Sequence, residues 1–140
     1  MKRTDQLGFS LVELLVVVVI IGIVAALAVP ALRKSVWSAE NGSTIANLRA
    51  MHSTEAGFYS QNERFGRIDE INSLMGRAFG NVTSNRAVRS QYVFEMVPAI
   101  PTDAQLKGEY TITATRNVPA EGIIYKYALT QDGEVTQILP

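Results

Sequence analysis

The chain has 140 residues, of which 47% are hydrophobic and 19% charged, and its 13 basic residues balance its 13 acidic ones. This length favours one domain, and the zero formal net charge excludes a strong overall field that would attract nucleic acid or an anionic membrane surface. The chain has no cysteine, which excludes a disulfide framework, a thiolate metal site and a cysteine nucleophile. The apolar residues are concentrated near the N-terminus.

The segment 9–32 is long and apolar enough to cross a membrane. Its 24 residues would form a helix of about 36 Å, and a hydrocarbon core is about 30 Å thick. Between Leu14 and Val29 no side chain is ionisable or carries an amide or hydroxyl group. The β-branched run at 16–21 has modest helix propensity in water, but in lipid only a helix pairs every backbone group of a single segment. We therefore expect a membrane helix over 9–32.

Glu13 is an unusual residue so early in an apolar segment. A cleavable secretory signal would explain Lys2, Arg3 and the A-x-A sequence at 26–28, but its apolar region should contain no acid. A plain single-pass anchor is the second alternative, and its orientation is not fixed because basic residues flank both ends. Neither alternative explains Glu13.

The sequence GFSLVE at positions 8–13 follows a short basic leader, precedes the apolar helix and resembles the type IV prepilin signal. In that family a prepilin peptidase cleaves after the glycine, on the cytoplasmic side, and methylates the new N-terminal amine. The resemblance implies cleavage between Gly8 and Phe9, loss of residues 1–8 as a leader peptide, and N-methylation of Phe9. It also identifies Glu13 as the acidic residue of the family's motif.

The chemistry of these residues agrees with the resemblance. Glycine has no side chain, so that an extended backbone can enter a protease cleft closely at Gly8. Cleavage creates an amine at Phe9, four residues from Glu13, and a helix N-terminus favours negative charge. We expect Glu13 to pair with the Phe9 amine of a neighbouring subunit, since a buried carboxylate without a partner is disfavoured and pairing would reward the correct register. The alternative is an interfacial carboxylate that has no partner.

The resemblance extends to Gly22 and Pro30, which match small or helix-breaking positions of the same helix. Pro30 lacks an N–H group and its ring clashes with the carbonyl of Ala26, so that a kink or a loosened turn is expected there. The alternative is that the membrane helix ends near Pro30.

A second, amphipathic helical pattern occupies residues 33–60. Apolar and acidic positions recur at steps of three and four along one face, namely Ile45, Leu48, Met51, Glu55 and Phe58 or Tyr59. We expect this half to pack on a sheet, with a hydrogen bond between Glu55 and Tyr59 at i and i+4. His52 is the only histidine and has no second histidine or cysteine with which to form a zinc site, so a polar residue of the helix surface is expected.

Residues 61–90 are rich in glycine and asparagine and are expected to form a loop with one short helix at 69–75. Acidic residues offset three of the five arginines in this region, and we expect no nucleic-acid binding. Asp69, Glu70 and Asp132 lack the D-x-D-x-D-G spacing of a calcium loop. We therefore expect neither a metal nor a cofactor.

From residue 91 to 140 the apolar pattern has a period of two, which predicts an antiparallel β-meander. The expected strands are Tyr92–Val97, Tyr110–Thr115, Ile123–Leu129 and Val135–Leu139, the last two joined by a turn at Asp132-Gly133. The expected fold is α+β: a long N-terminal helix, membrane-spanning and then amphipathic, packed on a C-terminal antiparallel sheet of about four strands. This order resembles the pilin fold, although many pilins close their C-terminal loop with a disulfide that this chain cannot form.

The resemblance implies a structural subunit of a type IV pilus, a major or minor pilin, rather than an enzyme. It implies a single-pass precursor in the inner membrane that is processed by a prepilin peptidase. An assembly platform and its ATPase would then polymerise the chain with itself and related pilins into a surface filament. One alternative is a type II secretion pseudopilin in a periplasmic pseudopilus. Another is a monomeric binding module held in the periplasm by an uncleaved anchor. Adhesion, twitching motility, DNA uptake and secretion all stay open as the role of the filament.

Overall fold

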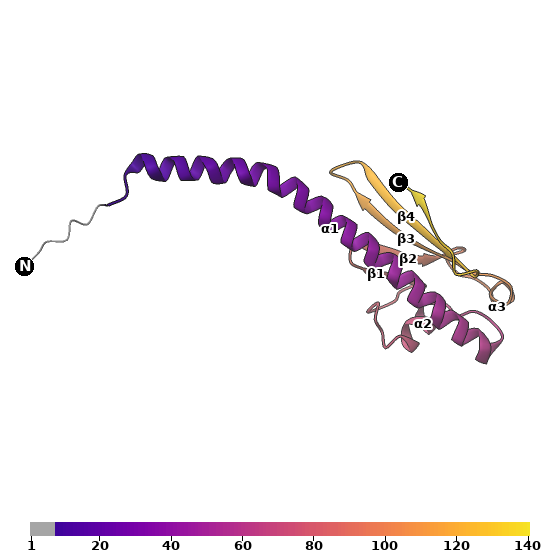
Figure 1. Ribbon diagram of the computed structural model, residues 1–140. Helices are drawn as coiled ribbons and strands as arrows, with labels where there is room; N and C mark the ends of the chain where they lie inside the picture. Colours follow the sequence, from indigo (N-terminus) through magenta and orange to yellow (C-terminus); the bar gives the residue numbers. More distant parts are fainter. Residues whose placement is uncertain (1–7) are drawn as a thin grey trace, which may run out of the picture. The chain divides into compact units, whose positions relative to one another are not determined.

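The computed structural model describes residues 8–140, which form a long helix, two short helices and an antiparallel sheet (Figure 1). The helices are α1 (Leu11–Asn62), α2 (Ile68–Leu74) and α3 (Asp103–Leu106), and the strands are β1 (Arg86–Arg89), β2 (Tyr92–Met96), β3 (Thr111–Val118), β4 (Ile123–Thr130) and β5 (Val135–Leu139). This is the predicted α+β class. Of the expected leader, residues 1–7 lie outside the described residues.

The chain separates into two compact units, residues 1–39 and 40–140, and each is described by itself. In the described part of the first unit, α1 begins at Leu11 and its helical hydrogen bonding continues past Gly22 and Pro30. The alternative that the helix ends near Pro30 is therefore wrong. The kink at this proline stays a prediction.

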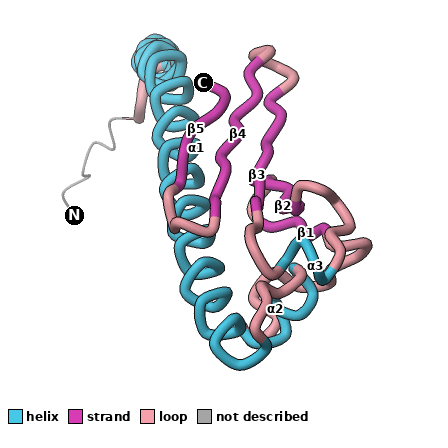
Figure 2. Tube along the Cα trace, turned by 90° about the vertical axis from the view of Figure 1, so that its right-hand side faces the viewer, coloured by secondary structure: helices cyan, strands magenta, loops and turns pink. Residues whose placement is uncertain are grey.

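The second unit contains a five-stranded sheet in which each strand pairs antiparallel with the next, in the order β1-β2-β3-β4-β5 (Figure 2). The predicted meander is confirmed, but it has one strand more than expected, because β1 lies within the predicted loop at 61–90. The β3–β4 pairing is also longer than expected, since it reaches from Thr111 opposite Thr130 to Val118 opposite Ile123.

Strand β1 was not predicted because the turn that follows it has no recognisable turn sequence. Arg89 pairs with Tyr92, which leaves a two-residue hairpin loop of Ser90 and Gln91. Both have positive φ, 49° and 67°, as the tight turns favoured in two-residue hairpins require. Such turns normally carry Asn, Asp or Gly. With serine and glutamine in their place, the sequence shows no hairpin signal here.

The core of the second unit lies between the sheet and the part of α1 that follows residue 40. Leu48 and Met51 are fully buried and share one apolar cluster with Tyr92, Phe94 and Ile112 of the sheet. Each aliphatic side chain of this size stabilises the folded state by about 1.5–3 kcal/mol when fully buried. The predicted packing face of the helix is therefore confirmed at its two central apolar positions.

Polar contacts fix the same part of α1 on the sheet. The Tyr92 hydroxyl donates a hydrogen bond to Oδ1 of Asn41 at 2.6 Å, and Arg116 forms an ion pair with Glu40. Because the hydroxyl of a buried tyrosine and a buried guanidinium both need partners, these two contacts select one position of the helix along the strands.

His52 is half-buried against the sheet, so it is not the ordinary helix-surface residue that was predicted. Its Nδ1 lies 2.8 Å from the Tyr110 hydroxyl. On its other side the backbone of the β4–β5 turn comes so close that a Cβ atom at Gly133 would lie 2.6 Å from Nε2 of His52. The histidine therefore joins α1 to the residue that precedes β3 and lies against the β4–β5 turn.

Candidate processing site and assembly surface

The predicted cleavage site lies in exposed backbone just before α1. Gly8, Phe9 and Ser10 precede the helix, and Phe9 has 80% of its surface exposed. A Cβ atom added at Gly8 would meet no atom of residues 8–140 within 4 Å, and Gly8 does not adopt the left-handed conformation. The described residues therefore do not require glycine here. A requirement for glycine would come from a partner that approaches this backbone closely.

Glu13 and Ser10 form a reciprocal pair of hydrogen bonds at the start of α1. Oε2 of Glu13 accepts the Ser10 N–H at 2.9 Å, and Oγ of Ser10 accepts the Glu13 N–H at 3.2 Å. The Leu14 N–H donates to the Ser10 carbonyl at 3.3 Å and closes the first turn. This is a capping box, which satisfies two backbone donors that a helix start would leave unpaired. It explains why the helix begins at Leu11.

The capping box also explains why the carboxylate occurs at this position. The spacing S-x-x-E before an apolar run is a recognisable helix-start signature, and it adds a partner within the chain to the predicted pairing of Glu13 with a neighbouring subunit. Cleavage between Gly8 and Phe9 would remove neither atom of the Glu13–Ser10 bond. Glu13 thus has a partner within its own chain, and such a cleavage would leave it in place.

The second feature is an apolar surface that surrounds the first part of α1. From Gly8 to Val36 every side chain is exposed. The large apolar side chains between Phe9 and Val36 each leave between 47% and 80% of their surface uncovered. By length and composition, α1 could cross a membrane. A helix that is apolar on all sides is stable only in lipid or in the core of a larger assembly. This surface therefore requires an apolar environment outside the chain.

Gly22 and Pro30 both lie within this apolar surface. A Cβ atom at Gly22 would meet no atom within 4 Å, so packing within the chain does not require the glycine, which costs about 1 kcal/mol of helix stability relative to alanine. Pro30 lies inside the helix and cannot donate to the carbonyl of Ala26. Both residues therefore weaken the helix without an evident benefit within the chain.

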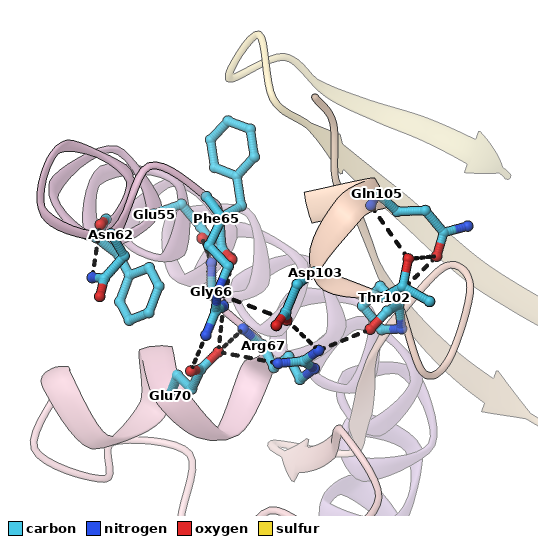
Figure 3. A network of polar contacts seen from close by, with 12 residues as sticks. Glu55, Asn62, Phe65, Gly66, Arg67, Glu70, Thr102, Asp103 and Gln105 are labelled. Carbon is cyan, nitrogen blue, oxygen red and sulfur yellow. Dashed lines mark hydrogen bonds and ion pairs between the residues drawn. The ribbon is translucent and has the colours of Figure 1, made fainter. Parts of the chain in front are cut away.

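A charged cluster lies just beyond the other end of α1, and Figure 3 shows three of its members, Arg67, Glu70 and Asp103. Its fourth member is Arg64, which forms ion pairs with Glu70 and Asp103. Arg64 binds Glu70 with two hydrogen bonds of 2.6 and 2.9 Å, and Arg67 binds Asp103 at 2.6 Å. The cluster joins the loop after α1 to α2 and α3. Glu70, considered above as a calcium ligand, is thus engaged by arginine. Within residues 8–140, no three acidic or histidine side chains come together as a metal site.

Glu55 is fully buried beside this cluster. Its Oε2 accepts the Gly66 N–H at 2.7 Å, and its Oε1 has no hydrogen-bond partner among the described residues. Burial raises the pKa of the carboxyl to about 8, although the hydrogen bond from Gly66 opposes this effect. The predicted Glu55–Tyr59 hydrogen bond is wrong, because the Tyr59 hydroxyl lies 3.4 Å from the Lys107 carbonyl instead. Glu55 is therefore mostly uncharged at neutral pH.

The described residues have a pilin-like α+β arrangement: an exposed apolar helix at the start of the chain and, within residues 40–140, a helix segment packed on an antiparallel sheet. The family model described as "Prokaryotic N-terminal methylation motif" matches residues 3–29. This range contains the capping box and most of the apolar surface. The predicted resemblance to prepilin-type proteins is confirmed by this match.

Two curated relatives are similar to the same chain. It is 38% identical to the type IV major pilin protein PilA of Myxococcus xanthus over 58 residues, which are 41% of this chain and 26% of that protein. It is 35% identical to the type II secretion system core protein G of Klebsiella michiganensis over 65 residues, 46% of each chain. The matches thus span about a quarter and about half of the relatives' lengths. No solved structure matches the chain.

Proposed function

We propose that this protein is a structural subunit of a type IV pilus, or of the pseudopilus of a type II secretion system. The observation that carries the proposal is the combination of a matched N-terminal methylation motif with an apolar helix surface that its own chain leaves uncovered. The two relatives have the names of a pilus protein and of a type II secretion protein, which supports both forms of the proposal.

The exposed apolar helix has two successive environments in this proposal. Before assembly it spans the inner membrane as a single-pass precursor, and its side chains contact acyl chains. After a prepilin peptidase has cleaved between Gly8 and Phe9 and Phe9 has been N-methylated, an assembly platform and its ATPase move the subunit into a filament. There the same side chains contact those of neighbouring subunits. Because both environments are apolar, the transfer loses little hydrophobic burial.

Glu13 sets the register of the filament in this proposal. Its Oε2 is occupied by the Ser10 N–H of its own chain, but a carboxylate offers about four acceptor sites. It can therefore keep its intrachain bond and also accept a hydrogen bond from the charged Phe9 amine of a neighbour. An amine and a carboxylate that were both buried without each other would each be strongly disfavoured. Only the correct axial position of two subunits avoids this cost.

Mass spectrometry of the N-terminus tests the proposal on protein purified from membranes of the native host. We expect a chain that starts at N-methylated Phe9. A chain that starts at Met1 would support the monomeric module with an uncleaved anchor, and a chain that starts at Val29 would support a secretory signal. Electron microscopy then separates the two filaments, because a pilus subunit is found in long surface fibres and a pseudopilus subunit is not.

A further inference from the structure

We infer that Ser10 is a positioning residue for peptidase cleavage: its hydroxyl, with the Glu13 carboxylate, ends the helix at Leu11 and so keeps the Gly8–Phe9 bond outside it. This deepens the proposed function and depends on it. The inference goes beyond the role of Glu13 in the filament, because it concerns the precursor before any neighbour is present.

The capping box competes with a longer helix for the same backbone donor. In a helix extended by one turn, the Glu13 N–H would bond the Phe9 carbonyl and the Val12 N–H would bond the Gly8 carbonyl. In the described chain neither bond is present, and the Glu13 N–H is bonded to the Ser10 hydroxyl instead. The capping box thus engages the Glu13 N–H, which would otherwise stabilise a helix that begins one turn earlier.

The Gly8 carbonyl is the group that the peptidase must attack. In the extended helix this carbonyl would accept the Val12 N–H, and the side chains of the new turn would cover the peptide bond. With the helix beginning at Leu11, the carbonyl lies in exposed backbone. The open space around Gly8 agrees with this, because none of the described residues has an atom within 4 Å of a Cβ built at Gly8.

The membrane increases the effect of the capping box on where the helix begins. Near the hydrocarbon boundary an unpaired N–H costs more than in water, so that the first turn gains more from any acceptor within reach. Ser10 and Glu13 supply acceptors that do not require residues 8 and 9 to become helical. A cap of ordinary strength shifts such an equilibrium by about fivefold.

The inference is tested with the full-length precursor in detergent micelles and a purified prepilin peptidase, by measuring kcat and KM separately. Ser10→Ala lowers the fraction of precursor with an accessible bond, so KM rises up to about fivefold while kcat is unchanged. Ser10→Thr restores the cap and the KM of the parent chain. Ser35→Ala is the matched control, because the Ser35 hydroxyl donates to the Ala31 carbonyl at 3.1 Å in the same helix, far from its start.

Carbon-13 chemical shifts of Gly8 and Phe9 in the same micelles provide the second measurement. We expect non-helical shifts in the parent chain, in Ser10→Thr and in Ser35→Ala, and a shift toward helical values in Ser10→Ala. An unchanged KM in Ser10→Ala would overturn the inference. A raised KM in Ser10→Ala with non-helical shifts of Gly8 and Phe9 would also overturn it, because the peptidase would then contact the serine side chain directly. If the parent chain itself is not cleaved at Gly8–Phe9, the proposed function fails rather than this inference.

Discussion

The Glu55 carboxylate accepts the Gly66 N–H at 2.7 Å and has no other hydrogen-bond partner among the described residues, although the side chain is fully buried. This bond joins the last turns of α1 to the loop that leads into α2. Burial favours the neutral form of this carboxyl, since charging it would place an anion where it is shielded from water.

Stability of the second unit should therefore fall as the pH rises. Glu55 has an ordinary pKa of 4.5 when unfolded, and burial raises the pKa in the folded chain to about 8. Between these values the folded state binds a proton that the unfolded state has lost, so that the free energy of unfolding decreases with pH. The loss is about 1.4 kcal/mol per unit of pKa difference, or a few kcal/mol in total. Urea unfolding of the full chain in detergent at pH 5, 7 and 9 measures it.

Glu55→Gln provides the control for this pH dependence, because glutamine keeps an acceptor for the Gly66 N–H and cannot titrate. Its free energy of unfolding should be nearly constant between pH 5 and 8.

Glu70→Gln should instead change how the free energy of unfolding depends on pH in the acidic range. The hydrogen bond from Arg64 lowers the Glu70 pKa, so that its contribution is lost as the pH falls. An equal slope between pH 5 and 8 in the parent chain and in Glu55→Gln would show that another group is responsible.

Gly66→Ala should destabilise the chain through overpacking. A Cβ atom there would lie 2.7 Å from Cδ1 and 2.9 Å from Cγ1 of Ile71, whose side chain is fully buried. We expect a loss of about 1–3 kcal/mol in thermal or urea unfolding. Gly57→Ala is the matched control, because Gly57 is an exposed position of α1 with no atom within 4 Å of a new Cβ. Gly57→Ala should stabilise the helix by up to about 1 kcal/mol. Equal effects of Gly66→Ala and Gly57→Ala on unfolding would contradict the prediction.

The sequence predicts the long elements of this chain because their signals are local. The run of apolar residues from 9 to 32 has no other stable form in lipid, and the steps of three and four that contain Leu48 and Met51 indicate which face is buried. Strand β1 lacks a local signal, since its turn residues Ser90 and Gln91 only rarely adopt positive φ.

The candidate site divides in the same way. The cleavage motif at Gly8–Phe9 and the S-x-x-E spacing of the capping box are both local patterns that can be recognised in the sequence. The Glu55–Gly66 bond could not be predicted, because its partner lies in a loop whose path depends on two ion pairs. Arg64 pairs with Glu70 of α2, and Arg67 pairs with Asp103, which lies 36 residues further along the chain. The Glu55–Tyr59 prediction failed for this reason: a local partner was assumed where a loop supplies the donor.

Gly133→Ala should destabilise the β4–β5 turn for two reasons. Gly133 has φ of 78°, which L-residues rarely adopt, and its Cβ would clash with the His52 ring. Gly122→Ala isolates the first reason, because Gly122 has φ of 65° and open space around it. We expect the free energy of unfolding to fall by about 1–2 kcal/mol in Gly122→Ala, where only the backbone conformation is unfavourable. Gly133→Ala should lose more. In the His52→Ala background the excess at Gly133 should disappear, and its persistence would mean that the ring is not the obstacle.

Glu13→Gln separates the role of this side chain in the capping box from its proposed pairing with a neighbouring subunit. Glutamine can still accept the Ser10 N–H, and a capping box tolerates it at this position, so cleavage at Gly8–Phe9 should be normal. Without a negative charge it cannot neutralise the Phe9 amine of a neighbour, and the yield of filaments should fall strongly. Glu13→Ala loses the acceptor for the Ser10 N–H but keeps the bond between the Ser10 hydroxyl and the backbone of residue 13. It should therefore still be processed, although less efficiently than Glu13→Gln.

The measurement for Glu13→Gln compares sheared filaments with the membrane fraction by immunoblotting, together with the N-terminal mass of each pool. We expect N-methylated Phe9 in the membranes and little protein in the filaments. Glu13→Gln could form filaments at the parent level while Glu13→Ala does not. Assembly would then depend on the hydrogen bond accepted by residue 13 rather than on its negative charge. Parent-level filaments from both variants would mean that Glu13 acts only within its own chain, and that the register is set by the apolar side chains alone.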